Sequence, residues 1–459
     1  MIGVTVVTDP ATARTPLRTR LTTPVRLRLW TGAVVFTALL VLVLTTLVMS
    51  RLTDEVQVIG SEAAPQAATA SDLYFALSDL DAQTARLVMI DNADALSANQ
   101  LDALRTYQQR SVQIDADLER ALTTASTERA RATVRDLLNQ LAIYRQLTGQ
   151  ALAAEHESPP QPLGSPPPSA LGYYAHATNV LHFQLLPIAT TLRTDSQARL
   201  ADAYAAEHRT AVGGIVLLVV CGAVLVILLA LLQLRLVRHF RRLLNPALLV
   251  ATLAAVGVVA AACFVLLDDT DRLNTAQRDD FAPYLALTQA QAVSYDAAAD
   301  TSRYVLSANL PYFQEDFRRK SGCLVNGGAC APDGDALSGG LAVLAAGPDT
   351  TDAQVRAVLD RWTAYERDHN GIVTLARSGQ VDSAINTLTG FRRGDAAFDF
   401  VYYDAAISDI AAGRKQAFDA ALADARDELS GWTIIPTVIM GTAILLVLFG
   451  MRRRLAEYR

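Results

Sequence analysis

Four stretches of about 20 residues without a charged side chain constrain this chain more than any other feature of its sequence. A helix of about 20 apolar residues crosses the ~30 Å hydrocarbon core of a bilayer. The first stretch is too long for the apolar region of a signal peptide, and the Ser50-Arg51-Leu52 that follows it has no small-x-small cleavage pattern. The sequence therefore predicts four retained membrane spans, at Trp30–Met49, Ala211–Leu232, Leu248–Leu267 and Trp432–Met451.

Basic residues are distributed unevenly among the segments that these spans separate. Segments 1–29, 233–247 and 452–459 hold 13 Arg and two acidic residues, whereas the rest of the chain holds 27 basic and 44 acidic residues. Short cytoplasmic segments of membrane proteins are enriched in Lys and Arg. We therefore expect a multi-pass protein of the cell (plasma) membrane with both termini cytoplasmic and two large extracytoplasmic domains, at 50–210 and 268–431.

Composition and motifs argue against several function classes. The net charge of −6 gives no reason to expect nucleic-acid binding. No phosphate-binding loop, nucleophile elbow or His-Glu-x-x-His motif occurs, and no His has a second metal ligand at helical spacing in an inward-facing register. The absence of charged residues in the spans argues against an ion or substrate path. We expect a protein without catalysis, cofactor or metal, whose non-protein partners are membrane lipids.

Helical periodicity dominates the first large segment. Apolar residues recur there at spacings of three and four residues, and the capping-box pair Ser97 and Gln100 marks the start of one helix. The pattern predicts four helices. The first ends at about Asn92, the second covers 97–125, the third covers 127–156, and the fourth begins at 171 and is kinked at Pro187. The Pro-rich stretch Ser158–Ser169 can only be a loop. Four antiparallel helices with both ends at the membrane predict a four-helix bundle.

The second large segment follows a similar plan with a different second helix. The sequence predicts a helix over 268–310, a short helix at 337–346, a helix from the capping-box pair Thr351 and Gln354, and a final helix after a break at 379–394. Cys323 and Cys330 flank a flexible, Gly-containing hexapeptide outside the membrane, which favours a disulfide. The remaining cysteines, Cys221 and Cys263, lie within spans and are interpreted as small packing residues.

Matched residues relate the two large segments. Each first helix has Ala-Pro and, about 20 residues later, an Arg that follows an Asp by seven positions (Asp79 and Arg86, Asp296 and Arg303). These matches and the duplicated layout indicate an internal duplication. The fold class is therefore all-α, with four transmembrane helices and two tandem extracytoplasmic four-helix bundles of the chemoreceptor-sensor type, fused as a pseudo-dimer.

Two groups of residues are candidate binding sites. In each matched pair the Asp and the Arg stand seven positions apart, on one helix face but too far apart for a direct ion pair. Arg86 and Arg303 therefore either form ion pairs with other helices or bind a carboxylate ligand. The loops farthest from the membrane either dock a partner or are tolerant surface loops. Their candidate partner-binding residues are Asp91, Asn92, Pro159, Pro160, Pro166, Asn326, Gln380, Arg392 and Arg393.

The stretch Glu62–Arg86 (EAAPQAATASDLYFALSDLDAQTAR), together with the doubled layout, resembles the actinobacterial four-pass membrane protein family GlnX. That family's gene neighbours are a glutamate/aspartate-binding lipoprotein, GlnH, and a soluble Ser/Thr kinase, PknG. The resemblance implies that the loaded lipoprotein docks outside and that the signal crosses to the kinase. Two alternatives remain open, a membrane scaffold of an envelope complex and direct small-molecule sensing by the bundles.

Overall fold

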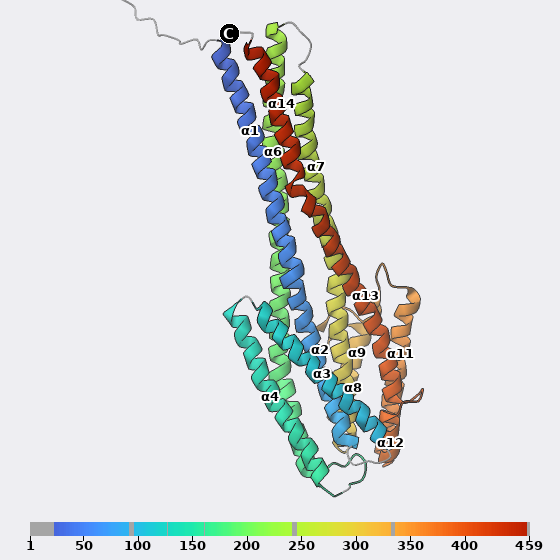
Figure 1. Ribbon diagram of the computed structural model, residues 1–459. Helices are drawn as coiled ribbons and strands as arrows, with labels where there is room; N and C mark the ends of the chain where they lie inside the picture. Colours follow the sequence, from blue (N-terminus) through green and yellow to red (C-terminus); the bar gives the residue numbers. More distant parts are fainter. Residues whose placement is uncertain are drawn as a thin grey trace, which may run out of the picture. The chain divides into compact units, whose positions relative to one another are not determined.

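A computed structural model describes residues 23–90, 96–125, 127–159, 161–240, 246–331 and 336–456. The fold is all-α, as predicted (Figure 1). The elements of the first half are α1 (Thr23–Val58), the π-helical turn η1 (Ile59–Ala63), α2 (Ala64–Ile90), α3 (Ser97–Thr124), α4 (Glu128–Glu157), α5 (Pro168–Val180), the π-helical turn η3 (Leu181–Leu185) and α6 (Leu186–Phe240).

The second half has more and shorter elements. They are α7 (Pro246–Ala276), the π-helical turn η4 (Gln277–Phe281), α8 (Ala282–Leu306), α9 (Pro311–Asn326), β1 (Gly328–Ala329), β2 (Ala336–Leu337), α10 (Leu341–Ala345), α11 (Asp352–Arg377), α12 (Val381–Thr389), α13 (Ala396–Ser430), the 3₁₀ turn η5 (Gly431–Thr433) and α14 (Ile435–Ala456). The two short strands are antiparallel, with Gly328 opposite Leu337.

Contacts divide the chain into two compact units. The span unit comprises Met1–Met49, Gly213–Leu266 and Gly431–Arg459, and the bundle unit comprises Ser50–Val212 and Leu267–Ser430. We call Ser50–Val212 the first repeat and Leu267–Ser430 the second repeat.

The span unit contains the four apolar stretches. Each predicted span lies in a helix that is long and apolar enough to cross a membrane. The buried side chains of this unit are apolar, as in the cluster of Val41, Leu229 and Ala255. At Gly222 a Cβ would lie 3.0 Å from the Val259 side chain, so the absent side chain lets the two helices approach closely.

The first repeat is built around one apolar core. Its helices α2, α3, α4, α5 and α6 begin and end within a few residues of the predicted positions. Leu77, Leu118, Leu141 and Leu185 are representative core residues from four of its elements. Because these positions recur at helical spacing, their burial explains why the sequence pattern was a good guide.

One local prediction for this repeat was wrong. The N-cap of α3 is Leu96 without a side-chain hydrogen bond, so Ser97 is the first helical residue and makes no capping box. Before Pro187 the chain widens into the π-helical turn η3. Proline lacks the N–H that an α-helical turn needs, and a π-helical turn accommodates this loss within a continuous helical path.

The second repeat has two helices that were not predicted. α9 begins at Pro311, where a proline with its fixed φ starts a helix without losing a needed N–H. α12 occupies much of the expected break at 379–394. The predicted short helix is present as α10, and the capping box of Thr351 and Gln354 is confirmed at the start of α11.

Equivalent contacts recur in the two repeats. A π-helical turn precedes the Ala-Pro pair in each (η1 and η4). Thr84 lies 3.0 Å from the hydroxyl of Tyr144, and Thr301 lies 3.2 Å from the hydroxyl of Tyr365. These contacts show that α2 and α8 occupy equivalent places in the two repeats, as do α4 and α11. Thr84 and Thr301 are 217 residues apart, and the same offset pairs Arg86 with Arg303.

Candidate functional site

Helices α2 and α8 pack against each other along a seam between the two repeats. Both are buried on nearly all sides, with 22 of 27 residues buried in α2 and 19 of 25 in α8. Across the seam the Tyr284 hydroxyl donates to Asp72 at 3.0 Å, and the rings of Phe75 and Tyr295 meet edge to face at 5.2 Å. A helix that is buried all round has no solvent face, so charged side chains on it need partners within the protein.

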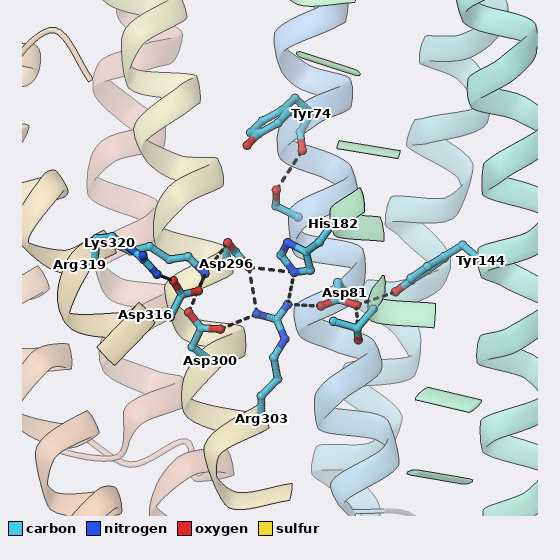
Figure 2. Close-up of polar contacts among 12 residues, drawn as sticks. Tyr74, Asp81, Tyr144, His182, Asp296, Asp300, Arg303, Asp316, Arg319 and Lys320 are labelled. Atoms are coloured by element: carbon cyan, nitrogen blue, oxygen red, sulfur yellow. Dashed lines mark hydrogen bonds and ion pairs between the residues drawn. The ribbon is translucent and has the colours of Figure 1, made fainter. Parts of the chain in front are cut away.

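Arg303 is the centre of a buried charge cluster on this seam (Figure 2). Its side chain is 3% exposed and pairs with Asp81 of α2, with Asp300 at 2.6 Å and with Asp296 at 3.1 Å. The prediction that residues seven apart cannot pair directly was wrong for Asp296 and Arg303. A helical side chain points back toward the N-terminus, and the long arginine spans the two turns.

Lys320 of α9 forms the second cation of the cluster. Its ammonium lies 2.5 Å from Asp296, 2.6 Å from Asp300 and 2.7 Å from Asp316. Lys320 is 5% exposed and lies within α9, a helix that the sequence did not predict. Arg319 pairs with Asp316 within α9, whereas the ion pairs of Lys320 with Asp296 and Asp300 tie α9 to α8 by charge.

His182 belongs to the same cluster and lies on the π-helical turn η3. Its Nε2 is 3.1 Å from Nη2 of Arg303 and 3.6 Å from Asp296. Burial lowers the pKa of His182 to about 4, although Asp296 acts in the opposite direction. The ring is therefore neutral at pH 7, and its lone pair can accept a hydrogen bond from Arg303.

Neighbouring charges favour the ionised forms of Asp296 and Arg303 despite their burial. Burial opposes the charge of Asp296, but Lys320 and the neighbouring cations together lower its pKa. Burial also opposes the charge of Arg303, yet Asp81, Asp300 and Asp296 raise its pKa well above the usual value. Such a network adds little net stability but strongly disfavours arrangements that separate its members.

Arg86, the counterpart of Arg303, lies in a different environment. Its Nη1 donates to Gln83 at 3.2 Å, and its guanidinium lies 5.9 Å from the ring centre of Phe391. Nε and Nη2 are buried and have no hydrogen-bond partner among the described residues. Asp79 does not pair with Arg86, because it accepts from Arg110 and, at 2.7 Å, from Gln83. Burial lowers the pKa of Arg86, with Asp102 and Asp79 opposing that shift.

The candidate docking residues differ in their exposure to solvent. Asp91, Asn92 and Pro160 lie outside the described residues. Pro166 is half-buried, and the remaining candidates are exposed: Pro159, Asn326, Gln380, Arg392 and Arg393.

Two contacts attach the first repeat to the unpredicted helix α12. Gly164 of the Pro-rich loop lies against Ile385, and Asn99 of α3 donates to the carbonyl of Thr389 at 3.0 Å. The Pro-rich loop therefore belongs in part to the contact between the repeats.

Cys323 and Cys330 form a disulfide with a Cα–Cα distance of 5.2 Å, which joins the end of α9 to the segment after β1. Within the described ranges, no group of three His, Cys, Asp or Glu side chains is placed to hold a metal ion.

Sequence reasoning missed Asp81, His182, Asp300 and Lys320 as site residues. A usable signal was the composition of α2 and α8, where isolated charges stand among Ala, Ser, Thr and Leu. Charges in such a background indicate buried, paired groups rather than a solvated face.

Comparison with known proteins gives one finding for the first repeat. Residues 55–205 match the family model of the actinobacterial sensor domain. No curated protein and no solved structure matches the chain. The match and the four apolar helices fit a multi-pass membrane protein with an actinobacterial sensor domain and a sensing or signalling role.

Proposed function

We propose that this chain is a transmembrane signal transducer that relays an extracytoplasmic amino-acid signal, glutamate or aspartate, to a cytoplasmic Ser/Thr kinase. The signal would arrive on a ligand-loaded binding lipoprotein, as the resemblance to GlnX implies. The observation that carries the proposal is the sensor-domain match over 55–205, since it overlaps the helix that runs from Arg28 to Ile90 and includes the first span.

The orientation is part of this proposal. The 13 Arg of segments 1–29, 233–247 and 452–459 support cytoplasmic termini and a cytoplasmic loop. Both repeats are then extracytoplasmic, where a disulfide such as Cys323–Cys330 persists.

The seam supplies a physical route for the signal. α2 and α8 belong to the same continuous helices as the first and third spans, Arg28–Ile90 and Pro246–Leu306. Helix shifts of about 1–2 Å are a common switching scale in packed interfaces. A partner that binds one seam arrangement better than another shifts the balance by that difference in affinity. The paired charges around Arg303 make the arrangements discrete, because intermediate positions would separate buried partners.

The test is a capture experiment with the full chain in native membranes. We expect the candidate lipoprotein to bind the chain more tightly in the presence of glutamate or aspartate than in their absence. We also expect kinase signalling to fail in a chain that lacks 1–25, 236–242 and 453–459, although lipoprotein capture remains. Ligand-independent capture, or intact signalling by the truncated chain, would contradict the relay and leave the scaffold alternative.

A further inference from the structure

The guanidinium of Arg86 has an unused edge. Nε and Nη2 of an arginine point the same way and form the fork that holds a carboxylate with two parallel hydrogen bonds. In Arg86 these are the two atoms that are buried without a partner among the described residues. A buried cation without its anion is costly, and such a group in a native structure requires an explanation.

The second repeat shows which side chains surround the equivalent arginine. Arg303 is surrounded by carboxylates, of which Asp81 reaches it from the other repeat and Asp300 from its own helix. With the offset of 217 residues, the counterpart of Asp300 is Gln83 and the counterpart of Asp81 is Ala298. The first repeat therefore has the arginine but lacks both of these carboxylates.

Arg86 lies beside an exposed loop of the second repeat. Phe391, whose ring lies 5.9 Å from the guanidinium, is 44% exposed in the loop between α12 and α13. That loop is closed on itself by the Asp395 carboxylate, which accepts from the backbone N–H of Arg392 at 2.9 Å.

We propose that the free fork of Arg86 binds the carboxylate of a small-molecule ligand between α2 and the loop that follows α12. A planar carboxylate matches the two parallel donors, and the acidic side chains around Arg303 are its counterparts within the protein. The inference rests on the proposed sensing role for its purpose, but its chemistry depends only on the residues around Arg86.

Arg426 offers a matched control. Its Nε and Nη2 are also buried without a partner among the described residues, and its guanidinium covers Gly60. It has no counterpart that holds a carboxylate in the other repeat, so we assign it a packing role. A substitution there removes the same kind of group without touching the proposed site.

The experiment follows thermal unfolding of the purified full chain in detergent, titrated with acetate, succinate, glutamate and aspartate. Phosphate, sulfate and ethylamine are the comparison probes. We expect at least one carboxylate to raise the unfolding temperature saturably, because a ligand of the folded state stabilises it. Phosphate and sulfate are expected to act more weakly, and ethylamine not at all.

Variants localise the effect. Arg86→Gln should weaken the response about 30-fold or more, since a lost buried charge partner costs at least ~2 kcal/mol. Arg426→Gln should respond as the unmodified chain does. Ala298→Asp should supply a carboxylate from the chain itself, raise the unfolding temperature without ligand and abolish the response. Arg86→Gln should fold, because it removes an unpaired charge.

Several results would overturn the proposal. They are the absence of any carboxylate response, an unchanged response in Arg86→Gln, an equal loss in Arg426→Gln, or a response confined to phosphate and sulfate. If carboxylate binding at Arg86 is not found, the proposed lipoprotein relay is still supported wherever ligand-dependent capture is observed. Conversely, carboxylate binding at Arg86 stands if capture and kinase signalling prove independent of ligand.

Discussion

Replacement of Arg303 by methionine tests whether the charge cluster holds the seam. Lys320 still pairs with Asp296 and Asp300 in that variant, so the carboxylate left without a cation is Asp81. Asp81 is 1% exposed at its side chain and keeps only the hydroxyls of Tyr144 at 3.2 Å and Thr178 at 3.5 Å. Removal of one partner from a buried ion pair costs about 3–5 kcal/mol. We expect a loss of that size in the free energy of unfolding.

A second substitution separates lost charge pairing from lost packing. Asp81→Asn removes the orphaned charge while keeping the shape, so the double variant should recover about 2 kcal/mol or more of the loss. Trp362 is fully buried in the bundle unit and can report its unfolding by fluorescence. Trp30 and Trp432 are changed to phenylalanine for this purpose, and the full chain is unfolded with urea in detergent.

An exposed ion pair provides the control for the assay. Lys415 and Asp419 lie 2.9 Å apart with side chains 44% and 57% exposed. Lys415→Met should change the free energy of unfolding by less than about 0.5 kcal/mol. A loss below about 1 kcal/mol in Arg303→Met, or a double variant no better than the single one, would refute the reasoning.

Three further perturbations test other parts of the bundle unit. Replacing Cys323 and Cys330 by serine should lower the free energy of unfolding by about 2.5 kcal/mol, from the loop-closure entropy of a separation of seven residues, and an unchanged urea midpoint would contradict this. Burial raises the pKa of Asp117 to about 6, so the folded state keeps a proton that the unfolded state releases. The free energy of unfolding should therefore fall by up to about 2 kcal/mol as the pH rises from about 4 to 6, a slope that Asp117→Asn should remove. Gly164→Ala, at φ 71° and 2.7 Å from an α12 side chain, should cost about 1–2 kcal/mol, whereas Gly172→Ala within α5 should be neutral or stabilising.

The sequence was sufficient for the features that depend on local patterns. Uncharged runs of about 20 residues identified the helices that can span a membrane, since the length of a span is set by bilayer thickness. The periodic residues Val134, Leu137 and Leu141 are buried in the first-repeat core, as helical spacing predicts. The Thr351 cap was found because its hydrogen bonds join residues three apart.

Features that depend on distant segments were not predictable in the same way. Half of the buried residues of α9 are polar, namely Gln314, Lys320 and Ser321, and their burial depends on partners in other helices. Lys320 is buried only because Asp296 and Asp300 of another helix receive its charge. Such pairings join residues about 20 positions apart or more, and no spacing rule within one helix identifies them.

The two repeats have diverged at the position where a sensor of this type can use an asymmetry. In a symmetric dimer both arginines would have the same partners, and one ligand site would imply a second. In this chain both terminal nitrogens of Arg303 pair with carboxylates of the protein, while Nε and Nη2 of Arg86 have no partner among the described residues. A ligand at Arg86 therefore acts on one half of the seam while the other half stays anchored. A ligand shifts an equilibrium only by the difference in its affinity for the two states. In Ala298→Asp the introduced carboxylate should occupy Arg86, so the carboxylate response should be lost while the affinity for the lipoprotein is unchanged. A response that persists in this variant would show that the asymmetry between the arginines has no part in sensing.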